Sequence, residues 1–185
     1  MSKTQENLAK AVTGESLARA KYTLFAIIAR DEGYEGIARI FEETAGNEYE
    51  HAERELEFLK DKIKVSQGIE IGPAGKTAEN LQAAADGENF ETSSMYPGFD
   101  KVARDEGEDE IADIFKEVGE VEEKHRDRYL AILEHVKSGT VFKRDEEIEW
   151  KCLNCGYVHK GKEAPEKCPA CGKPQAWYEP RGLNF

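Results

Sequence analysis

The segment RDEGYEGIARIFEETAGNEYEHAERELEFL, residues 30–59, occurs twice in this chain of 185 residues. Its second copy is RDEGEDEIADIFKEVGEVEEKHRDRYLAIL, residues 104–133, and 14 of the 30 aligned positions are identical at an offset of 74. Each copy places a glycine, Gly33 or Gly107, between two stretches of helical periodicity. Each copy therefore predicts a helix, a turn and a second helix. Two such pairs predict an all-α four-helix bundle made by internal duplication.

Both copies carry a glutamate and a histidine three residues apart: Glu48 with His51, and Glu122 with His125. Steps of three, four and seven residues stay on one face of a helix, so each pair falls on the apolar stripe that a bundle buries. An unpaired carboxylate is costly to bury, and a metal cation removes that cost. The repeated pairs therefore predict a metal site inside the bundle.

The other two helices supply further carboxylates. Glu15 shares a face with Leu8 and Tyr22, and the segment GENFETSSMYP contains Glu88 and Glu91. The offset of 74 would match Glu15 to the residue after Glu88, so the repeat slips by one here, and the sequence offers no local reason for the slip. The proline that ends the segment predicts a kink or a late helix start.

The whole set is a glutamate from each of two helices and a Glu-x-x-His pair from each of the other two. This is the dinuclear iron or manganese pattern of ferritin-like bundles. Glu91 is surplus to it. From spacing alone, Glu91 is either a further ligand or an acid that only orients one.

The C-terminal segment holds all four cysteines, Cys152, Cys155, Cys168 and Cys171, in two Cys-x-x-Cys-Gly motifs. Two such motifs predict a tetrahedral site of four thiolates in a small domain of turns and strands, and both zinc and iron accept it. We expect the bundle at 1–138, a linker at 139–148 and the metal-bound β/turn domain at 149–185.

Charge restricts the function classes. The net charge of −12 argues against general binding to nucleic acid or to an anionic membrane. The sequence has no apolar run long enough to cross a bilayer, and MSKTQENLAK lacks the apolar core of a secretory signal, so we expect a cytoplasmic protein. Residues 150–185 hold six Lys and Arg against three Glu, a net of +3, which leaves −15 for the rest. Either these parts dock by charge, within or between subunits, or they are two separately soluble modules.

Together these motifs resemble the rubrerythrin family over nearly the whole chain. The matching segments are GESLARAKY (14–22), NEYEHA (47–52), GPAGKTAENL (72–81), GENFETSSMYP (87–97), VEEKHRDRYL (121–130) and WKCLNCGYVHKGKEAPEKCPACG (150–172). The last segment is similar to a rubredoxin with a shorter gap between its cysteine pairs. The resemblance implies a ferritin-like bundle followed by a rubredoxin-like domain.

The resemblance also implies a function. It indicates a non-haem di-iron peroxidase that reduces hydrogen peroxide to water in oxidative-stress defence. The implied cofactors are two irons in the bundle and one iron on the four cysteines. Electrons would come from NADH or NADPH through a reductase, often by way of a separate rubredoxin. The family's members imply a homodimer or a larger homo-oligomer.

Carried over by position, the resemblance implies that Glu48 and Glu122 bridge the two irons. Glu15 and Glu88 would be terminal ligands, and His125 would hold the second iron.

The resemblance further implies that the first iron exchanges its ligand, binding His51 when reduced and Glu91 when oxidised. Tyr22 and Tyr96 match tyrosines that hydrogen-bond to ligating carboxylates. We expect these four residues to be the catalytic ones.

Three other functions stay open at this point. A ferroxidase or iron-handling protein would use the same fold and oxidise ferrous iron with oxygen. A binding protein would recruit a partner through the C-terminal domain, with zinc on its four cysteines, and would use the bundle as a scaffold. Superoxide or oxygen could also replace peroxide as the substrate.

Overall fold

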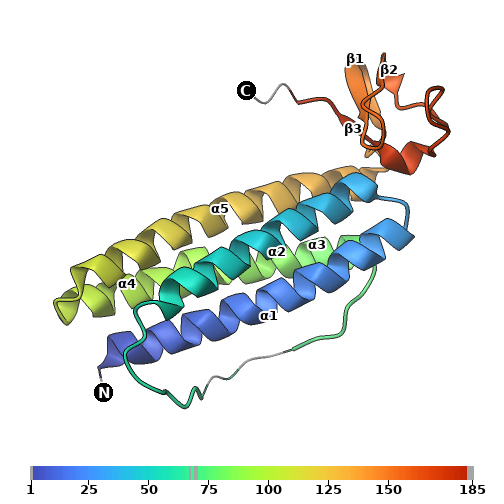
Figure 1. The fold of residues 1–185 in the computed structure, drawn as a ribbon. Helices are drawn as coiled ribbons and strands as arrows, with labels where there is room; N and C mark the ends of the chain where they lie inside the picture. The colour runs from blue at the N-terminus through green and yellow to red at the C-terminus, as the bar shows by residue number, and fades with distance from the viewer. Residues whose placement is uncertain (1, 67, 69–70, 183–185) are drawn as a thin grey trace.

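The computed structural model describes residues 2–66, 68 and 71–182. Long helices lie side by side in an elongated bundle, and a small β domain sits at one end (Figure 1). The helices are α1 (Lys3–Asp31), α2 (Glu35–Leu56), α3 (Thr77–Phe90), α4 (Tyr96–Asp105) and α5 (Asp109–Ser138). Helices α3 and α4 are joined by a π-helical turn, Glu91–Met95, and together form the third member of the bundle. The predicted four-helix bundle is confirmed.

Two glycines make the tight turns that the repeat predicts. Gly33 lies between α1 and α2 with a φ of 87°, and Gly107 lies between α4 and α5 with a φ of 76°. In this left-handed region a side chain would be strained, so glycine is favoured. Each half of the repeat is therefore an antiparallel helix pair, as expected.

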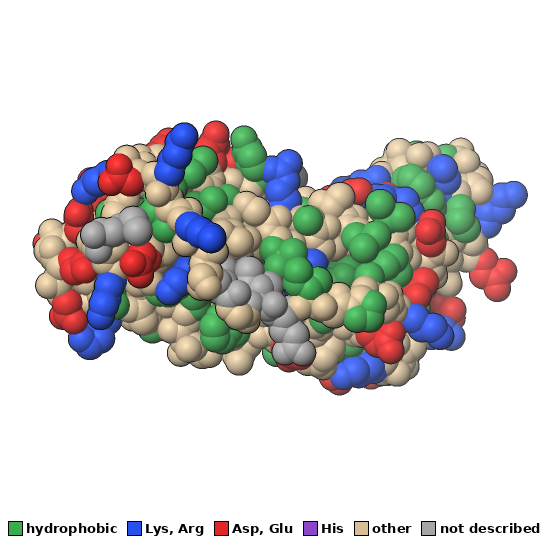
Figure 2. Space-filling view, turned by 90° about the horizontal axis from the view of Figure 1, so that it is seen from below, with side chains coloured by type: hydrophobic (Ala, Val, Ile, Leu, Met, Phe, Trp, Pro, Cys, Tyr) green, Lys and Arg blue, Asp and Glu red, His purple; other side chains and the backbone are tan. Residues whose placement is uncertain are grey.

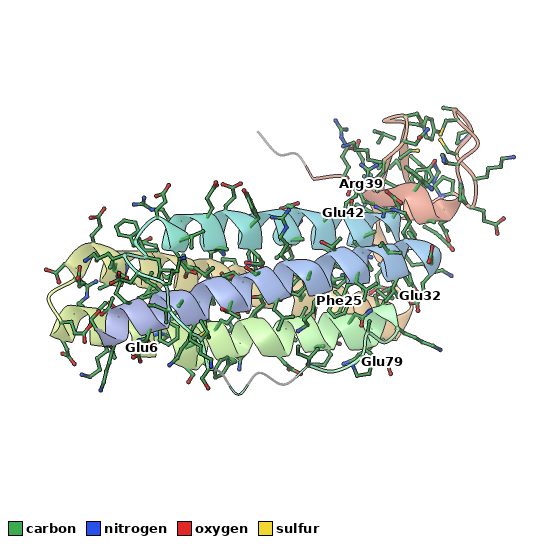
Figure 3. All side chains as sticks on the ribbon, turned by 60° about the horizontal axis from the view of Figure 1, so that its bottom comes forward. Glu6, Phe25, Glu32, Arg39, Glu42 and Glu79 are labelled. Atoms are coloured by element: carbon green, nitrogen blue, oxygen red, sulfur yellow. The ribbon has the colours of Figure 1, made fainter. Side chains whose placement is uncertain are left out.

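The connection between the halves spans residues 57–76, and its described parts, 57–66, 68 and 71–76, lie along the outside of the bundle beside α1 (Figure 1). Helix α3 begins at Thr77 because Glu79 caps it: the Lys76 N–H donates to the Glu79 carboxylate at 2.8 Å. The Thr77 N–H donates to Glu32 at the end of α1, and Figure 3 labels both glutamates at this end of the bundle. The last part of this connection thus packs against the first half.

The core is divided into two apolar clusters along the bundle axis. One cluster includes Phe25, Phe41 and Leu133, and the other includes Leu8 and Phe115. In every helix of the bundle, the predicted ligand positions fall between these clusters. The stripes predicted from the repeat are therefore buried as expected.

The π-helical turn explains the slip in the repeat. Before the turn, equivalent buried residues are 73 apart, as in Glu15 and Glu88; after it they are 74 apart, as in Tyr22 and Tyr96. The Tyr96 N–H donates to the carbonyl oxygen of Glu91, five residues back, instead of four. The second half thus holds one extra residue, which the wider turn absorbs without rotating either flanking helix.

The C-terminal domain is a three-stranded antiparallel sheet in the order β2-β1-β3, with β1 (Lys143–Cys152), β2 (Val158–Glu163) and β3 (Tyr178–Pro180). A 3₁₀ turn, Gln175–Trp177, precedes β3. Strand β1 begins at Lys143, which pairs with Glu163, so the second part of the segment expected as a linker, 139–148, is extended and paired. The first half of β1 is exposed and highly charged, so its sequence lacks the apolar alternation by which a strand is recognised.

The β domain contacts the end of the bundle near the α1–α2 turn (Figure 1; Figure 3 labels Arg39 on this end of α2). The Arg39 guanidinium donates to the Leu153 carbonyl oxygen at 3.4 Å, and the rings of Tyr34 and Phe142 stack with centroids 6.2 Å apart. Among the described residues, no salt bridge joins the two parts. Within the part of the chain that the structure describes, the contact is therefore made by a hydrogen bond and by ring packing, without a direct ion pair. No described helix is long and apolar enough to span a membrane.

Candidate metal centres

The bundle gathers six of the predicted ligands into two overlapping groups. Each group brings four ligand atoms within 4.8 Å of one another. The first contains Glu15 and His51, and the second contains Glu88 and His125; both groups contain Glu48 and Glu122. Each group thus has one glutamate and one histidine of its own and shares two carboxylates with the other group. This is the arrangement expected for a pair of metal ions.

The carboxylate oxygens of this cluster test whether cations fit. Four of them, one each on Glu15, Glu48, Glu88 and Glu122, are buried and make no well-aligned hydrogen bond to any described residue, although His51 Nδ1 lies 2.9 Å from the Glu122 oxygen. Such atoms are rare in folded proteins because each costs free energy when it is left unpaired. All four belong to the two ligand groups, so the donor set fits a pair of cations bound by oxygen and nitrogen.

The histidines lie between the shared carboxylates. His51 Nδ1 is 2.9 Å from Glu122 and 3.0 Å from Glu48, and His125 Nδ1 is 2.6 Å from Glu122. Burial lowers the pKa of His51, but hydrogen bonds to the two carboxylates raise it to about 10. Burial raises the pKa of Glu122, but hydrogen bonds from both histidines lower it to about 2. The histidines are thus held where positive charge is strongly favoured.

The two glutamates that belong to one group each, Glu15 and Glu88, have raised pKa values. Burial, followed by the negative charge of Glu91, raises the pKa of Glu15 well above its ordinary value. Burial, followed by the charge of Glu122, raises the pKa of Glu88 in the same way. The buried carboxyl groups therefore cannot all be ionised at neutral pH in the absence of compensating charge. Cations bound between them would supply that charge.

The two unshared glutamates, Glu15 and Glu88, each accept a hydrogen bond from a buried tyrosine. The Tyr22 hydroxyl donates to Glu88 at 2.5 Å, and the Tyr96 hydroxyl donates to Glu15. In both cases the tyrosine and the glutamate come from different halves of the repeat. The structure thus places both predicted tyrosines on the predicted carboxylates.

Glu91 stands apart from both groups. It opens the π-helical turn, is only partly buried, and lines a cavity of about 750 Å³ between α1 and the third helix of the bundle. Burial and the negative charges of Glu122 and Glu48 raise its pKa to about 8. A side chain at Gly14 would meet the Glu91 carboxylate at 3.9 Å. Glu91 therefore lies beside the ligand cluster, at its more open side.

Sequence reasoning missed a buried acid beside the ligand cluster. Glu55 of α2 is fully buried, and one of its oxygens lies 3.0 Å from the Tyr96 hydroxyl. A signal was present, since Glu55 lies seven residues after Glu48 and so on the same helix face.

The four cysteines form the second centre. Their sulfur atoms lie within 4.8 Å of one another, with Cys152 to Cys171 and Cys155 to Cys168 at 3.7 Å. A metal at about 2.3 Å from four tetrahedral sulfurs needs sulfur separations of about 3.8 Å. Each motif ends in a glycine of positive φ, whose N–H donates to the carbonyl oxygen of the first cysteine at 2.9 Å. The residues therefore fit one metal ion in a compact thiolate cage.

A helical bundle with a paired carboxylate–histidine site, followed by four thiolates, defines the class: a ferritin-like di-iron protein with a rubredoxin-like domain. Two irons fit the bundle and one fits the cysteines. The family profile of rubrerythrin matches residues 6–133, and that of the rubrerythrin rubredoxin-like domain matches residues 150–179. The chain belongs to the rubrerythrin family.

Known relatives resemble the chain over its full length. It is 50% identical to rubrerythrin of Porphyromonas gingivalis, covering 100% of this chain and 92% of the relative. It is 47% identical to a putative rubrerythrin of Methanocaldococcus jannaschii, covering 97% and 93%. The solved structure of nigerythrin in a mixed-valent state is 38% identical, with a TM-score of 0.66 over 98% of this chain and 87% of that one. Both the sequence and the arrangement of domains are thus shared with these proteins.

Proposed function

We propose that this protein is a peroxidase that reduces hydrogen peroxide to water with electrons that enter through the four-thiolate site. One observation carries the proposal: two metal groups that share Glu48 and Glu122 lie on the same chain as a thiolate cage. The paired site suits a reaction of two electrons, and the single site suits transfer of one electron at a time. The combination favours a reaction centre with its own electron relay.

The geometry supports the ligand roles implied by the family. We assign Glu48 and Glu122 as bridging ligands because they alone belong to both groups. Glu15 and Glu88 then serve as terminal carboxylates, and His125 serves as the nitrogen ligand of the second iron. Iron bound there would supply two electrons and open coordination positions for peroxide.

We assign His51 and Glu91 as alternative ligands of the first iron. His51 lies within the group that contains Glu15, whereas Glu91 lies beside it at the cavity. Oxidation adds positive charge to the site, which favours a carboxylate over a neutral histidine. A carboxyl that is free in one state can also hold or release a proton, and reduction of hydrogen peroxide to two waters consumes two protons.

The remaining residues position this machinery. Tyr22 and Tyr96 fix the orientation of the terminal carboxylates through their hydroxyl groups. The buried rings of Phe41 and Phe115 lie one on each side of the site and keep bulk water from the bundle axis. The cavity at Glu91 is the side from which we propose that peroxide enters.

The proposed electron donors are a rubredoxin or an NAD(P)H-dependent reductase. We place the protein in the cytoplasm, where the four thiols that would bind a metal stay reduced. We also propose a homo-oligomer. Leu24 and Ile27 of α1 are about half exposed, at 46% and 51%, and Figure 2 shows hydrophobic side chains gathered between charged ends on one face.

The test is anaerobic stopped-flow mixing of the fully reduced, iron-loaded protein with hydrogen peroxide or with oxygen, following the visible absorption of the thiolate iron. A peroxidase regains its colour rapidly with peroxide and much more slowly with oxygen. Faster recovery with oxygen would instead indicate a ferroxidase or an oxidase. A protein that stays colourless with every oxidant has no redox-active iron on its cysteines, and the proposed relay is then wrong.

A further inference from the structure

At a buried position next to the ligand cluster, the two halves of the bundle carry side chains of different chemistry. Tyr129 of α5 lies seven residues after Glu122, and Glu55 of α2 lies seven residues after Glu48. These two positions are equivalent in the repeat, and both side chains are fully buried. The Tyr129 ring packs on Tyr22 with centroids 5.5 Å apart, whereas Glu55 contacts the Tyr96 hydroxyl. At this position the second half thus has an aromatic ring, and the first half has a carboxyl group.

The Tyr96 hydroxyl lies between two carboxyl groups. It is within hydrogen-bond distance of Glu15 and 3.0 Å from Glu55. A tyrosine hydroxyl has one proton and can donate it to one acceptor. If both carboxylates were ionised, only one could accept the hydroxyl proton, and the other would face the hydroxyl oxygen with no hydrogen between them. One of the two carboxyl groups must therefore bring its own proton.

The identity of that group follows from the metal site. This step rests on the proposed role of Glu15 as an iron ligand. A ligating carboxylate is ionised and can only accept, so the Tyr96 proton points to Glu15. Glu55 must then donate its proton to the Tyr96 oxygen.

We propose that Glu55 is a protonated positioning residue, which donates to the Tyr96 hydroxyl and thereby fixes the Tyr96 proton on Glu15. Its surroundings agree with this role. Glu55 is 0% exposed, and its second oxygen has no hydrogen-bond partner among the described residues. Burial raises its pKa to about 8. A neutral carboxyl costs far less to bury than a charged one.

The position would be better filled by an apolar residue if stability alone mattered. A buried, half-satisfied carboxyl is destabilising, and replacing it with a side chain of similar volume is often neutral or stabilising. The equivalent position in the other half is filled by the aromatic residue Tyr129, which supplies no carboxyl. The carboxyl at residue 55 therefore serves the hydrogen-bond chain from Glu55 through Tyr96 to Glu15.

The first test is infrared difference spectroscopy of the iron-loaded protein at neutral pH, comparing wild type with Glu55→Gln. We expect the wild type to show a protonated carboxyl C=O band that the variant lacks and that shifts in deuterated water. The matched control is Glu35→Gln on the same helix, since Glu35 is also buried but is paired with Arg30 and Arg39. This control should remove carboxylate bands only. If Glu55→Gln also removes only carboxylate bands, Glu55 is ionised and the proposal is wrong.

The second test measures iron affinity by competition with a chelator. Glu55→Leu leaves Tyr96 without its donor, and we expect about tenfold weaker iron binding in the bundle. Glu55→Gln keeps an N–H donor and should bind iron almost as tightly as wild type. Equal affinity in Glu55→Leu and wild type would overturn the proposal. Circular dichroism checks folding, which the leucine should preserve because it removes a buried carboxyl.

Neither test depends on peroxidase activity. If the reduced protein fails to react with peroxide but the C=O band disappears in Glu55→Gln, the proposed function fails and the role of Glu55 stands. If peroxide reacts rapidly but the band persists in the variant, the reverse holds.

Discussion

At the scale of single residues, the site depends on contacts between the halves of the repeat. Glu15 of the first half is held by Tyr96 of the second, and Glu88 of the second is held by Tyr22 of the first. Neither half can therefore complete a metal site alone. Substitutions at these positions should affect iron binding and turnover more than they affect folding.

Glu91 provides the most direct test of the catalytic assignment. Replacing it with Ala removes both the proposed alternative ligand and a carboxyl that can move a proton. We expect the peroxide-driven reoxidation rate to fall by roughly a hundredfold, the usual size of a lost acid–base contribution. The measurement is stopped-flow absorption, with the exposed Glu50→Gln on α2 as the control. An unchanged rate in Glu91→Ala would show that this carboxyl neither ligates nor transfers protons in the reaction.

Gly119 tests how closely Tyr96 must approach α5. A Cβ atom at Gly119 would lie 3.0 Å from the Cβ of Tyr96, which is too close for normal packing. We expect Gly119→Ala to lower the free energy of unfolding by about 1–3 kcal/mol and to loosen the Tyr96 contact with Glu15.

The matched control for Gly119 is Gly46→Ala on α2, where an added Cβ meets no atom within 4 Å. Alanine should stabilise that helix by about 0.5–1 kcal/mol. Denaturant unfolding of both variants measures the difference, and equal effects would contradict the steric argument.

At the scale of elements, the π-helical turn carries one residue that the flanking helices do not need. We expect deletion of the exposed Ser93 to convert the turn to α-helix and to leave Tyr96 and Glu88 in register. Deletion of the exposed Asp86 in α3 should instead rotate one part of the helix against the other by about 100°. Thermal unfolding should show a near-normal midpoint for the first variant and a large loss for the second. Similar losses in both would mean that the turn is not an insertion.

The start of α1 is held by the α4–α5 corner. The Glu106 carboxylate accepts hydrogen bonds from the Thr4 hydroxyl and from the N–H groups of Thr4 and Lys3, and these lower its pKa from 4.5 to about 2. Its ionised form is therefore bound more tightly in the folded state. The stability it contributes is present above pH 4.5 and is lost as the pH falls toward about 2.

Comparison of wild type with Glu106→Gln tests this capping contact. The difference in unfolding free energy should be largest above pH 4.5 and should shrink as the pH falls toward about 2. Denaturant titrations at several pH values measure it. A difference that stays constant across this range would rule out the ionised cap.

At the scale of the whole molecule, the two metal centres should be separable in function. In Cys171→Ala the thiolate cage loses one sulfur, while the bundle keeps its own core and ligands. We expect the reduced bundle iron to react once with peroxide at a near-normal rate, whereas sustained turnover from a reductase and rubredoxin is lost. Single-turnover and steady-state assays measure the two separately. Normal steady-state turnover in this variant would mean that electrons reach the bundle iron without passing through the four-thiolate site.

Much of this molecule was predictable from its repeat. The doubled Glu-x-x-His pairs and the apolar stripes locate Glu48, His51, Glu122 and His125 on one buried face, because helical periodicity leaves little freedom. The π-helical turn appeared only as an unexplained slip, since its hydrogen bonds depend on tertiary packing. Glu55 was missed because an acid near a helix end is usually exposed. The early start of β1 was missed because strand pairing, not side-chain burial, defines its first half.

The duplication also has a consequence for how the two irons have diverged. Two differences between the halves, Glu55 opposite Tyr129 and the π-helical turn that begins with Glu91, both place a carboxyl near Glu15. On the other side, the aromatic ring of Tyr129 packs against Tyr22, which holds Glu88. Once a gene duplication had joined two equal halves in one chain, each copy was free to specialise. Two similar sequences therefore build surroundings that are not equivalent at the two ends of the cluster.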